Sequence, residues 1–175
     1  MCVIIKLLHI PPSTPAQYHC HSESGVFYLE PIKPMEPVLW HEAFDDPAYV
    51  FQVKWDGVRS LAYADGGVRL INRHLNERTD QYPEVVEALS DLPEETVLDG
   101  ELVALGDSGK PDFYRVMKRE LAKAPGKIAD MRRRVPAFYM VFDVIAWGGE
   151  DYTGRPLTER QETLGRNLMG SDHVR

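Results

Sequence analysis

The sequence predicts an α+β fold in which antiparallel sheets are flanked by helices. Two runs rich in β-branched and aromatic residues, 58–64 and 68–73, flank Asp65-Gly66-Gly67, which is a strong hairpin signal. Other strand-like runs follow, and helical segments interrupt them without an alternating βαβ rhythm. A doubly wound parallel sheet is therefore not expected.

The remaining elements can be assigned in chain order from periodicity and punctuation. Pro83 suits the first turn of a helix, and Thr158 with Gln161 forms a potential capping box for the last one. Asp99-Gly100 either bends one strand or divides it into a pair. We expect strands at 48–55, 96–105 and 136–147, and helices at 83–92, 112–122 and 157–168.

Length and composition predict one globular domain preceded by an arm. A chain of 175 residues with 43% hydrophobic and 27% charged residues can bury a sizeable core. Residues 1–31 are proline-containing and aperiodic, so we expect an extended or partly disordered arm before a domain at 32–175. No run approaches the length of a membrane span, and Cys2 and Cys20 make no disulfide framework, so a cytoplasmic protein is expected.

The charge balance argues against loose coating of nucleic acid. The net charge is −7, whereas phosphate binding favours basic surfaces. The only tight cationic run is Met-Arg-Arg-Arg-Val at 131–135. We interpret it as a solvated loop, with a local basic patch as the alternative.

The stretch Val-Lys-Trp-Asp-Gly-Val-Arg at 53–59 carries the strongest chemical signal. Apolar neighbours predict that Lys54 is partly desolvated and hence a nucleophile. Gly57 allows close approach of the backbone to a ligand, and Arg59 offers a fork of donors to a phosphate or a carboxylate. Downstream, Asp99 and Glu101 occupy alternate strand positions and could share a divalent cation. This set, without a glycine-rich phosphate loop, indicates lysine attack on a phosphoryl centre.

Residues 54–59 resemble the Lys-x-Asp-Gly-x-Arg motif of covalent nucleotidyltransferases, which comprise ATP-dependent DNA ligases, RNA ligases and mRNA capping enzymes. Segments 72–84, 97–103 and 138–160 resemble the motifs that follow in that family, in the same order. Lys-Trp-Asp-Gly and the Phe-Asp block favour bacterial ATP-dependent DNA ligases, including the ligase module of end-joining proteins. The resemblance implies part of a nucleotidyltransferase (ATP-grasp-like) ligase adenylation domain.

The resemblance also implies roles at matching positions. Lys54 would attack the α-phosphate of ATP and hold AMP, while Asp56 would orient the lysine or a metal-bound water. Arg59 and Arg73 would hold the ribose and later the 5′-phosphate of DNA, and Glu101 would bind the ribose or the metal.

Three further positions concern the base and the scaffold. Phe142 would stack on adenine, and Asp143 would brace the fold. Gln52 stands where these ligases usually carry a glutamate that meets the adenine amino group, so it can accept a hydrogen bond there without a charge.

The implied cofactors are ATP and Mg²⁺, and the implied substrate is nicked or broken duplex DNA in repair or recombination. End-joining repair proteins, or a chain that supplies the rest of the domain, are the implied partners. The family's later Glu-Gly and Lys-x-Lys motifs have no counterpart after Phe142. We therefore expect an incomplete adenylation domain that is inactive alone, binds ATP weakly and does not seal nicks. The alternatives are a non-catalytic remnant or nucleotide-binding interaction fragment, or an RNA ligase or capping-type enzyme.

Overall fold

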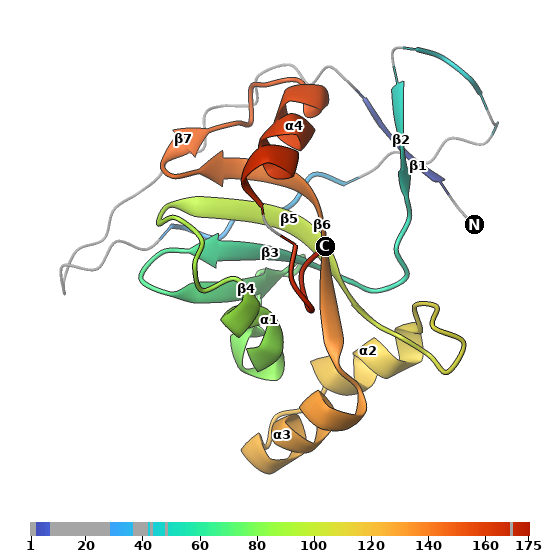
Figure 1. Cartoon of the computed structure of the whole chain (residues 1–175), viewed down its shortest axis with the longest axis vertical. Coiled ribbons are helices and arrows are strands. Elements are labelled where there is room, and N and C mark those ends of the chain that lie inside the picture. Colours follow the sequence, from blue (N-terminus) through green and yellow to red (C-terminus); the bar gives the residue numbers. More distant parts are fainter. Residues whose placement is uncertain (1–2, 8–28, 37–41, 43, 48, 169) are drawn as a thin grey trace.

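The computed structural model describes residues 3–7, 29–36, 42, 44–47, 49–168 and 170–175 (Figure 1). Most of the expected arm at 1–31, together with Cys2 and Cys20, lies outside this part of the chain. In the described part, no helix has both the length and the apolar character needed to cross a membrane.

A five-stranded antiparallel sheet forms the body of the molecule and confirms the predicted fold class (Figure 1). The hairpin is also confirmed: the Asp65 N–H donates to the Gly67 carbonyl at 2.9 Å, and both turn glycines have positive φ. In spatial order the strands are β4 (Val68–Asn72), β3 (Val58–Ala64), β5 (Thr96–Ala104), β6 (Ala137–Trp147) and β7 (Glu150–Asp151).

A separate two-stranded sheet precedes this body along the chain. It pairs β1 (Val3–Leu7) with β2 (Tyr49–Val53) in antiparallel register. β2 confirms the strand expected at 48–55, whereas β1 belongs to the segment for which we expected an arm.

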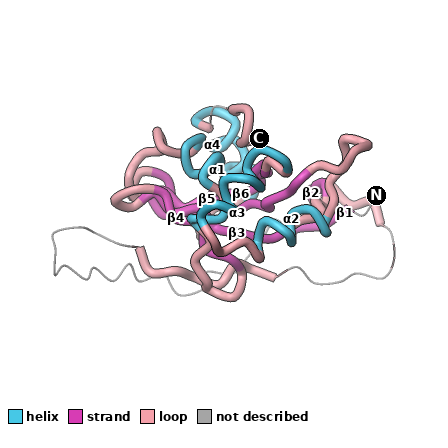
Figure 2. The backbone as a smooth tube through the Cα atoms, turned by 90° about the horizontal axis from the view of Figure 1, so that it is seen from below, coloured by secondary structure: helices cyan, strands magenta, loops and turns pink. Residues whose placement is uncertain are grey.

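Helices α1 and α4 lie on one side of the strands (Figure 2). The helices are α1 (Pro83–Ala88), α2 (Phe113–Glu120), α3 (Pro125–Arg134) and α4 (Leu157–Asn167), with a short 3₁₀ turn, η1, at Thr79–Gln81. Three of them confirm the predicted helices, with earlier ends for α1 and α2.

Two local predictions were wrong. The cationic run 131–135 is not a loop, because its arginines form the last turn of α3, where positive side chains interact favourably with the helix dipole. The capping box is absent, because α4 begins after Pro156 and no side chain caps it. Residues 113–134 therefore form two helices, α2 and α3. Because no side chain caps α4, other contacts must hold this helix in place.

The strand β5 is one bent strand and not a pair. Its register against β6 shifts at Asp99/Gly100, and all its residues except Glu101 are buried. The larger core cluster includes Leu98 and Leu102 of β5, while Val97 belongs to a smaller cluster against which Leu29 and Ile32 pack. Both faces of the sheet are thus covered at β5.

β6 is also an interior strand. β5 borders it on one side, and β7 and residues 173–175 border it on the other. The Tyr139 N–H donates to the His173 carbonyl at 2.8 Å, and the Val141 N–H donates to the Arg175 carbonyl at 2.7 Å. No residue of β6 is exposed, so both of its faces are at least partly covered, which accounts for the lack of strict alternation in segment 136–147.

Tyr139 links the three central strands at Gly100. Its side chain is fully buried, and its hydroxyl lies 2.9 Å from the carbonyl oxygen of Ser60 and 3.1 Å from that of Leu98. A Cβ at Gly100 would lie 2.6 Å from Tyr139 Cε2 and 2.8 Å from the Met140 carbonyl oxygen. Only glycine therefore allows the ring to lie against β5.

We predict that Gly100→Ala lowers the free energy of unfolding by at least about 2 kcal/mol, because the added methyl group overpacks a site whose ring is held by two carbonyls. Urea denaturation monitored by circular dichroism measures the loss. The matched control is Gly126→Ala in α3, where a Cβ meets nothing within 4 Å and stability should rise by up to about 1 kcal/mol. Equal effects of the two substitutions would contradict the prediction.

Candidate active site

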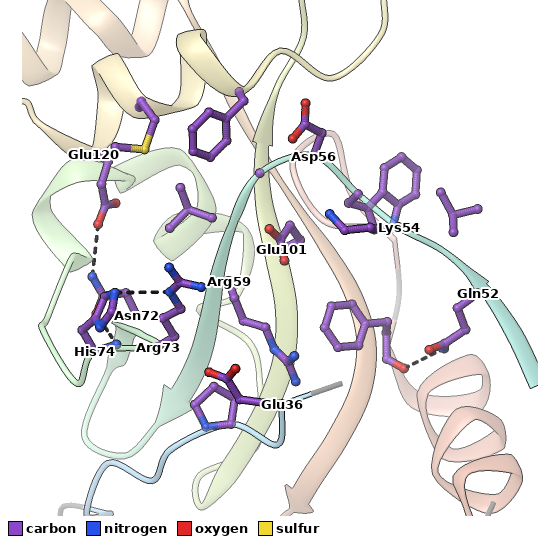
Figure 3. Close-up of a pocket in the computed structure, with 18 of the residues that line it drawn as sticks. Glu36, Gln52, Lys54, Asp56, Arg59, Asn72, Arg73, His74, Glu101 and Glu120 are labelled. Atoms are coloured by element: carbon purple, nitrogen blue, oxygen red, sulfur yellow. Dashed lines mark hydrogen bonds between the residues drawn. The ribbon is translucent and has the colours of Figure 1, made fainter. Parts of the chain in front are cut away.

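A cavity of about 580 Å³ opens where β2 ends and β3 begins, and α2, β5 and β6 supply its other walls (Figure 3). Its size suits a nucleotide-sized ligand. All seven candidate residues line it: Gln52, Lys54, Asp56, Arg59, Arg73, Glu101 and Phe142. The remaining lining residues are Pro34, Met35, Glu36, Val53, Trp55, Gly57, Val58, Asn72, His74, Phe113, Met117 and Glu120.

Lys54 lies in the connection between β2 and β3. The expected desolvation was wrong: Lys54 is exposed, and Val53 beside it is 50% exposed. The reason is local, because β2 ends at Val53 and the chain turns there before β3 starts at Val58. The amine at the cavity is thus accessible to a reactant.

Gly57 lines the cavity and also packs closely against β5. A Cβ at this position would lie 2.2 Å from the Leu102 carbonyl oxygen and 2.9 Å from Glu101 Cγ. The turn that carries Lys54 and Asp56 therefore lies directly against β5. This contact sets the distance between that turn and the carboxylates of β5.

Arg59 is held in place by two neighbours. Its Nε and Nη2 donate to the two carboxylate oxygens of Asp99 at 2.8 and 2.5 Å, and Asp99 is 2% exposed. The guanidinium carbon also lies 5.1 Å from the centre of the Phe142 ring. Arg59 is therefore preorganised on the cavity wall.

The pairing with Arg59 leaves Asp99 poorly placed to share a cation with Glu101. Both oxygens of Asp99 already accept hydrogen bonds from Arg59. Asp99 is thus better described as an anchor of Arg59.

Glu101 lies opposite Arg59 in the pairing of β3 with β5. Burial raises the pKa of this carboxyl to about 7, against the partly offsetting positive charges of Arg59 and Lys54. Glu101 therefore changes between its acid and ionised forms near neutral pH, close to the positive charges of Arg59 and Lys54.

We predict that Glu101 makes the folded protein lose stability as pH rises from about 4.5 to about 7. The folded state keeps the Glu101 proton in this window while the unfolded state has released it, so unfolding becomes more favourable as pH rises. Glu101→Gln removes this contribution. Melting temperatures are measured from pH 4.5 to 8.5. The melting temperature of the variant relative to that of the wild type should rise up to about pH 7, and the difference should then stay constant. A difference that does not vary with pH would refute the assignment.

Gln52 and Phe142 form the wall opposite α2. Gln52 Nε2 donates to the Phe142 carbonyl at 3.4 Å (Figure 3). This contact uses the amide nitrogen of Gln52 and does not involve its amide oxygen. The Phe142 ring lines the cavity. Across the cavity, the exposed Arg73 donates from Nε to His74 Nε2 at 3.2 Å.

The residue after Phe142 anchors this wall to α4. Asp143 and Arg160 are buried, and Arg160 Nε and Nη2 donate to the two oxygens of Asp143 at 2.7 and 3.0 Å. Arg160 also donates to the Arg155 carbonyl at 2.5 Å. The predicted bracing role of Asp143 is confirmed, and this pair provides the anchor that α4 lacks at its cap.

We predict that Asp143→Asn lowers the free energy of unfolding by about 3–5 kcal/mol, because it leaves a buried guanidinium without its counter-charge. Chemical denaturation measures the change. The control is Glu162→Gln, which breaks the exposed pair with Arg166 on the same helix, 3.2 Å apart, and should cost under about 0.5 kcal/mol. If Asp143→Asn lowered the free energy of unfolding as little as the control does, the Asp143–Arg160 pair would not be an anchor of α4.

Glu120 is a cavity residue that sequence reasoning missed. Its Oε1 accepts from Asn72 Nδ2 at 3.2 Å (Figure 3). The same oxygen accepts from Arg78 Nε at 2.7 Å, and Oε2 accepts from the Tyr82 hydroxyl at 3.0 Å. It therefore ties α2 to the segment that bears Arg73. No local pattern marks it, because its partners lie 38 to 48 positions earlier in the chain.

Comparison with known proteins supports the motif assignment. The sequence profile of the ATP dependent DNA ligase domain family matches residues 33–174. The SPbeta prophage-derived DNA ligase-like protein LigB of Bacillus subtilis is 37% identical over 143 residues, covering 79% of this chain and 48% of LigB. DNA ligase C of Mycobacterium tuberculosis is 35% identical over 146 residues, covering 82% of this chain and 40% of that protein. The chain thus spans less than half the length of these relatives.

The fold comparison agrees with the sequence comparison. A mycobacterial DNA ligase D structure, complexed with ATP and MES, superposes with a TM-score of 0.52 at 30% identity, over 66% of this chain and 35% of that one. The ligase domain of M. tuberculosis LigD gives a TM-score of 0.50 at 31% identity, over 65% and 34% of the two chains.

Proposed function

This chain belongs to the ATP-dependent DNA ligase domain family, and on that premise we propose that it carries the lysine-bearing part of an adenylation domain that activates breaks in duplex DNA for sealing. One observation carries the proposal. Seven residues picked from separate motifs between positions 52 and 142 line a single cavity, with an exposed lysine among them.

Lys54 is the proposed nucleophile. Its amine forms a bond to the α-phosphorus of ATP, the bond from that phosphorus to the bridging oxygen breaks, and pyrophosphate leaves while the nitrogen loses a proton. Arg59, held by Asp99, presents a fixed positive charge near the reacting phosphate. Arg73, exposed at the cavity, would bind the ribose and later the 5′-phosphate of the DNA.

The wall formed by Gln52 and Phe142 is the proposed adenine site. The Phe142 ring offers a stacking surface, and the Gln52 amide oxygen can accept from the exocyclic amine of the base. The ATP in the mycobacterial ligase D structure supports a nucleotide in the equivalent domain. Asp143 would act on this site only by holding its strand.

Mg²⁺ is the proposed metal, taken up together with the triphosphate. Glu101 and Asp56 place carboxylate oxygens on the cavity wall, and Mg²⁺ in nucleotide sites commonly uses one or two carboxylates plus phosphate oxygens. When bound, the ion supplies charge neutralisation for the phosphates. Asp56 would orient Lys54 or a water of the ion.

The proposed substrates are nicked or broken duplexes, in repair or recombination. Residues 32–175 are proposed to form the lysine-bearing part of the adenylation domain. Nick sealing would depend on the Glu-Gly and Lys-x-Lys motifs that occur later in the family. End-joining repair proteins and a chain with those motifs are the proposed partners. The proposed compartment is the cytoplasm.

We predict that any covalent, acid-labile adenylate formed on incubation with Mg²⁺ and ATP labelled at the α-phosphate lies on Lys54. Lys54→Ala should abolish the label by removing the nucleophile, and Lys54→Arg should do the same because a guanidinium stays protonated. Denaturing gel electrophoresis measures it. Lys110→Ala, which alters an exposed lysine outside the cavity, is the control and should retain full labelling. Label that persists in Lys54→Ala would overturn the assignment, and absence of label in the wild type would favour a non-catalytic nucleotide-binding fragment.

A further inference from the structure

Helices α2 and α3, residues 113–134, form a basic arm in an acidic chain. This α2–α3 arm holds eight of the chain's 20 Lys and Arg residues but only two of its 27 Asp and Glu residues. It therefore carries a charge of +6, and the rest of the chain carries −13. So large a contrast between one arm and the remainder produces a directional field around the molecule.

The positive charge of the arm is only partly neutralised. Lys118, Lys123 and Lys127 are exposed, and no ion pair involves them among the described residues. Arg133 and Arg134 share a single carboxylate, that of Asp130, at 3.3 and 3.0 Å. Free ammonium groups thus remain along the outer surface.

The arm also adjoins the cavity. Phe113 and Met117 of α2 line the cavity wall, and the arm projects from the end of the sheet opposite α4 (Figure 1). On the outer side of the same helix, Tyr114, Lys118 and Leu121 follow the i, i+4, i+7 spacing, so they share one face. Tyr114 is 80% exposed and Leu121 is 67% exposed. A ligand held by this face would lie beside the proposed reaction centre.

We propose that the α2–α3 arm binds the phosphate backbone of duplex DNA and thereby directs the duplex to the cavity. The inference rests on the proposed function for the identity of the polyanion. Unpaired lysines suit phosphates because they act as compact point charges on flexible stems, without any demand on base sequence. The acidic remainder of the chain repels the duplex, so the arm is the face through which it can approach.

The test is binding of a fluorescent nicked duplex to the full chain, followed by anisotropy over a range of salt concentrations. Lys123→Glu with Lys127→Glu should weaken binding at least about tenfold at 0.1 M salt and reduce the salt slope by about 2, since each phosphate contact contributes about 0.9. The matched control is Arg166→Glu with Arg175→Glu, an equal change of net charge at exposed positions outside the arm. This control should leave the binding affinity and the salt slope within about twofold of the wild-type values.

A second variant should act in the opposite direction. Asp130→Asn frees Arg133 and Arg134 and should tighten binding by a few-fold. Duplex binding that is absent in the wild type, or equal in both double variants, would overturn the proposal. Salt-dependent self-association that the arm variants abolish, with duplex binding unchanged, would assign the arm to an acidic protein surface and overturn it as well. Adenylate formation on Lys54 needs no DNA, so its failure would refute the proposed function without altering these binding results.

Discussion

The close contact between β3, β5 and β6 is the constraint on which the site depends. Gly57 and Gly100 are the two points where neighbouring groups occupy the space of a side chain. Tyr139 fills the second of these points and lies within hydrogen-bond distance of carbonyls from two strands. With these strands in register, Arg59 comes opposite Glu101 and within reach of Asp99. The cavity wall is therefore a consequence of how tightly the sheet packs.

The same packing gives the two carboxylates of β5 different properties. Asp99 is buried against Arg59, which satisfies both of its oxygens. Glu101, two positions later, is half-buried with less compensation, so its pKa rises to about 7. A buried carboxyl without a dedicated partner is costly to ionise, and such groups concentrate at functional sites. The strand thus supplies one fixed charge pair and one group open to a ligand.

Buried ion pairs hold the outer elements to this sheet. Asp143 and Arg160 join α4 to β6, and the fully buried Arg119 of α2 pairs with Glu84 of α1 at 2.8 Å. Each pair connects residues distant in sequence, and each would leave a buried charge if one partner were removed. Glu120 adds a third connection at the cavity rim. The basic arm is therefore attached to the cavity wall by specific contacts.

The sequence by itself determined the fold class and most strands and helices, because hairpin turns and periodicity are local signals. Its resemblance to the ligase family supplied seven of the residues that line the cavity. The sequence marked Asp99-Gly100 as a bend within one strand or a break between two, and the structure decided for the bend. Tertiary structure alone decided that Lys54 is exposed, that Gly57 serves strand packing, that Asp99 anchors Arg59, and that Glu120 belongs to the site. These properties depend on which atoms meet across the sheet, from segments up to 48 residues apart, and local patterns carry no information about such distances. The helix at 125–134 was missed for a related reason, since its stability comes with the contacts of its few apolar residues, such as the buried Ile128.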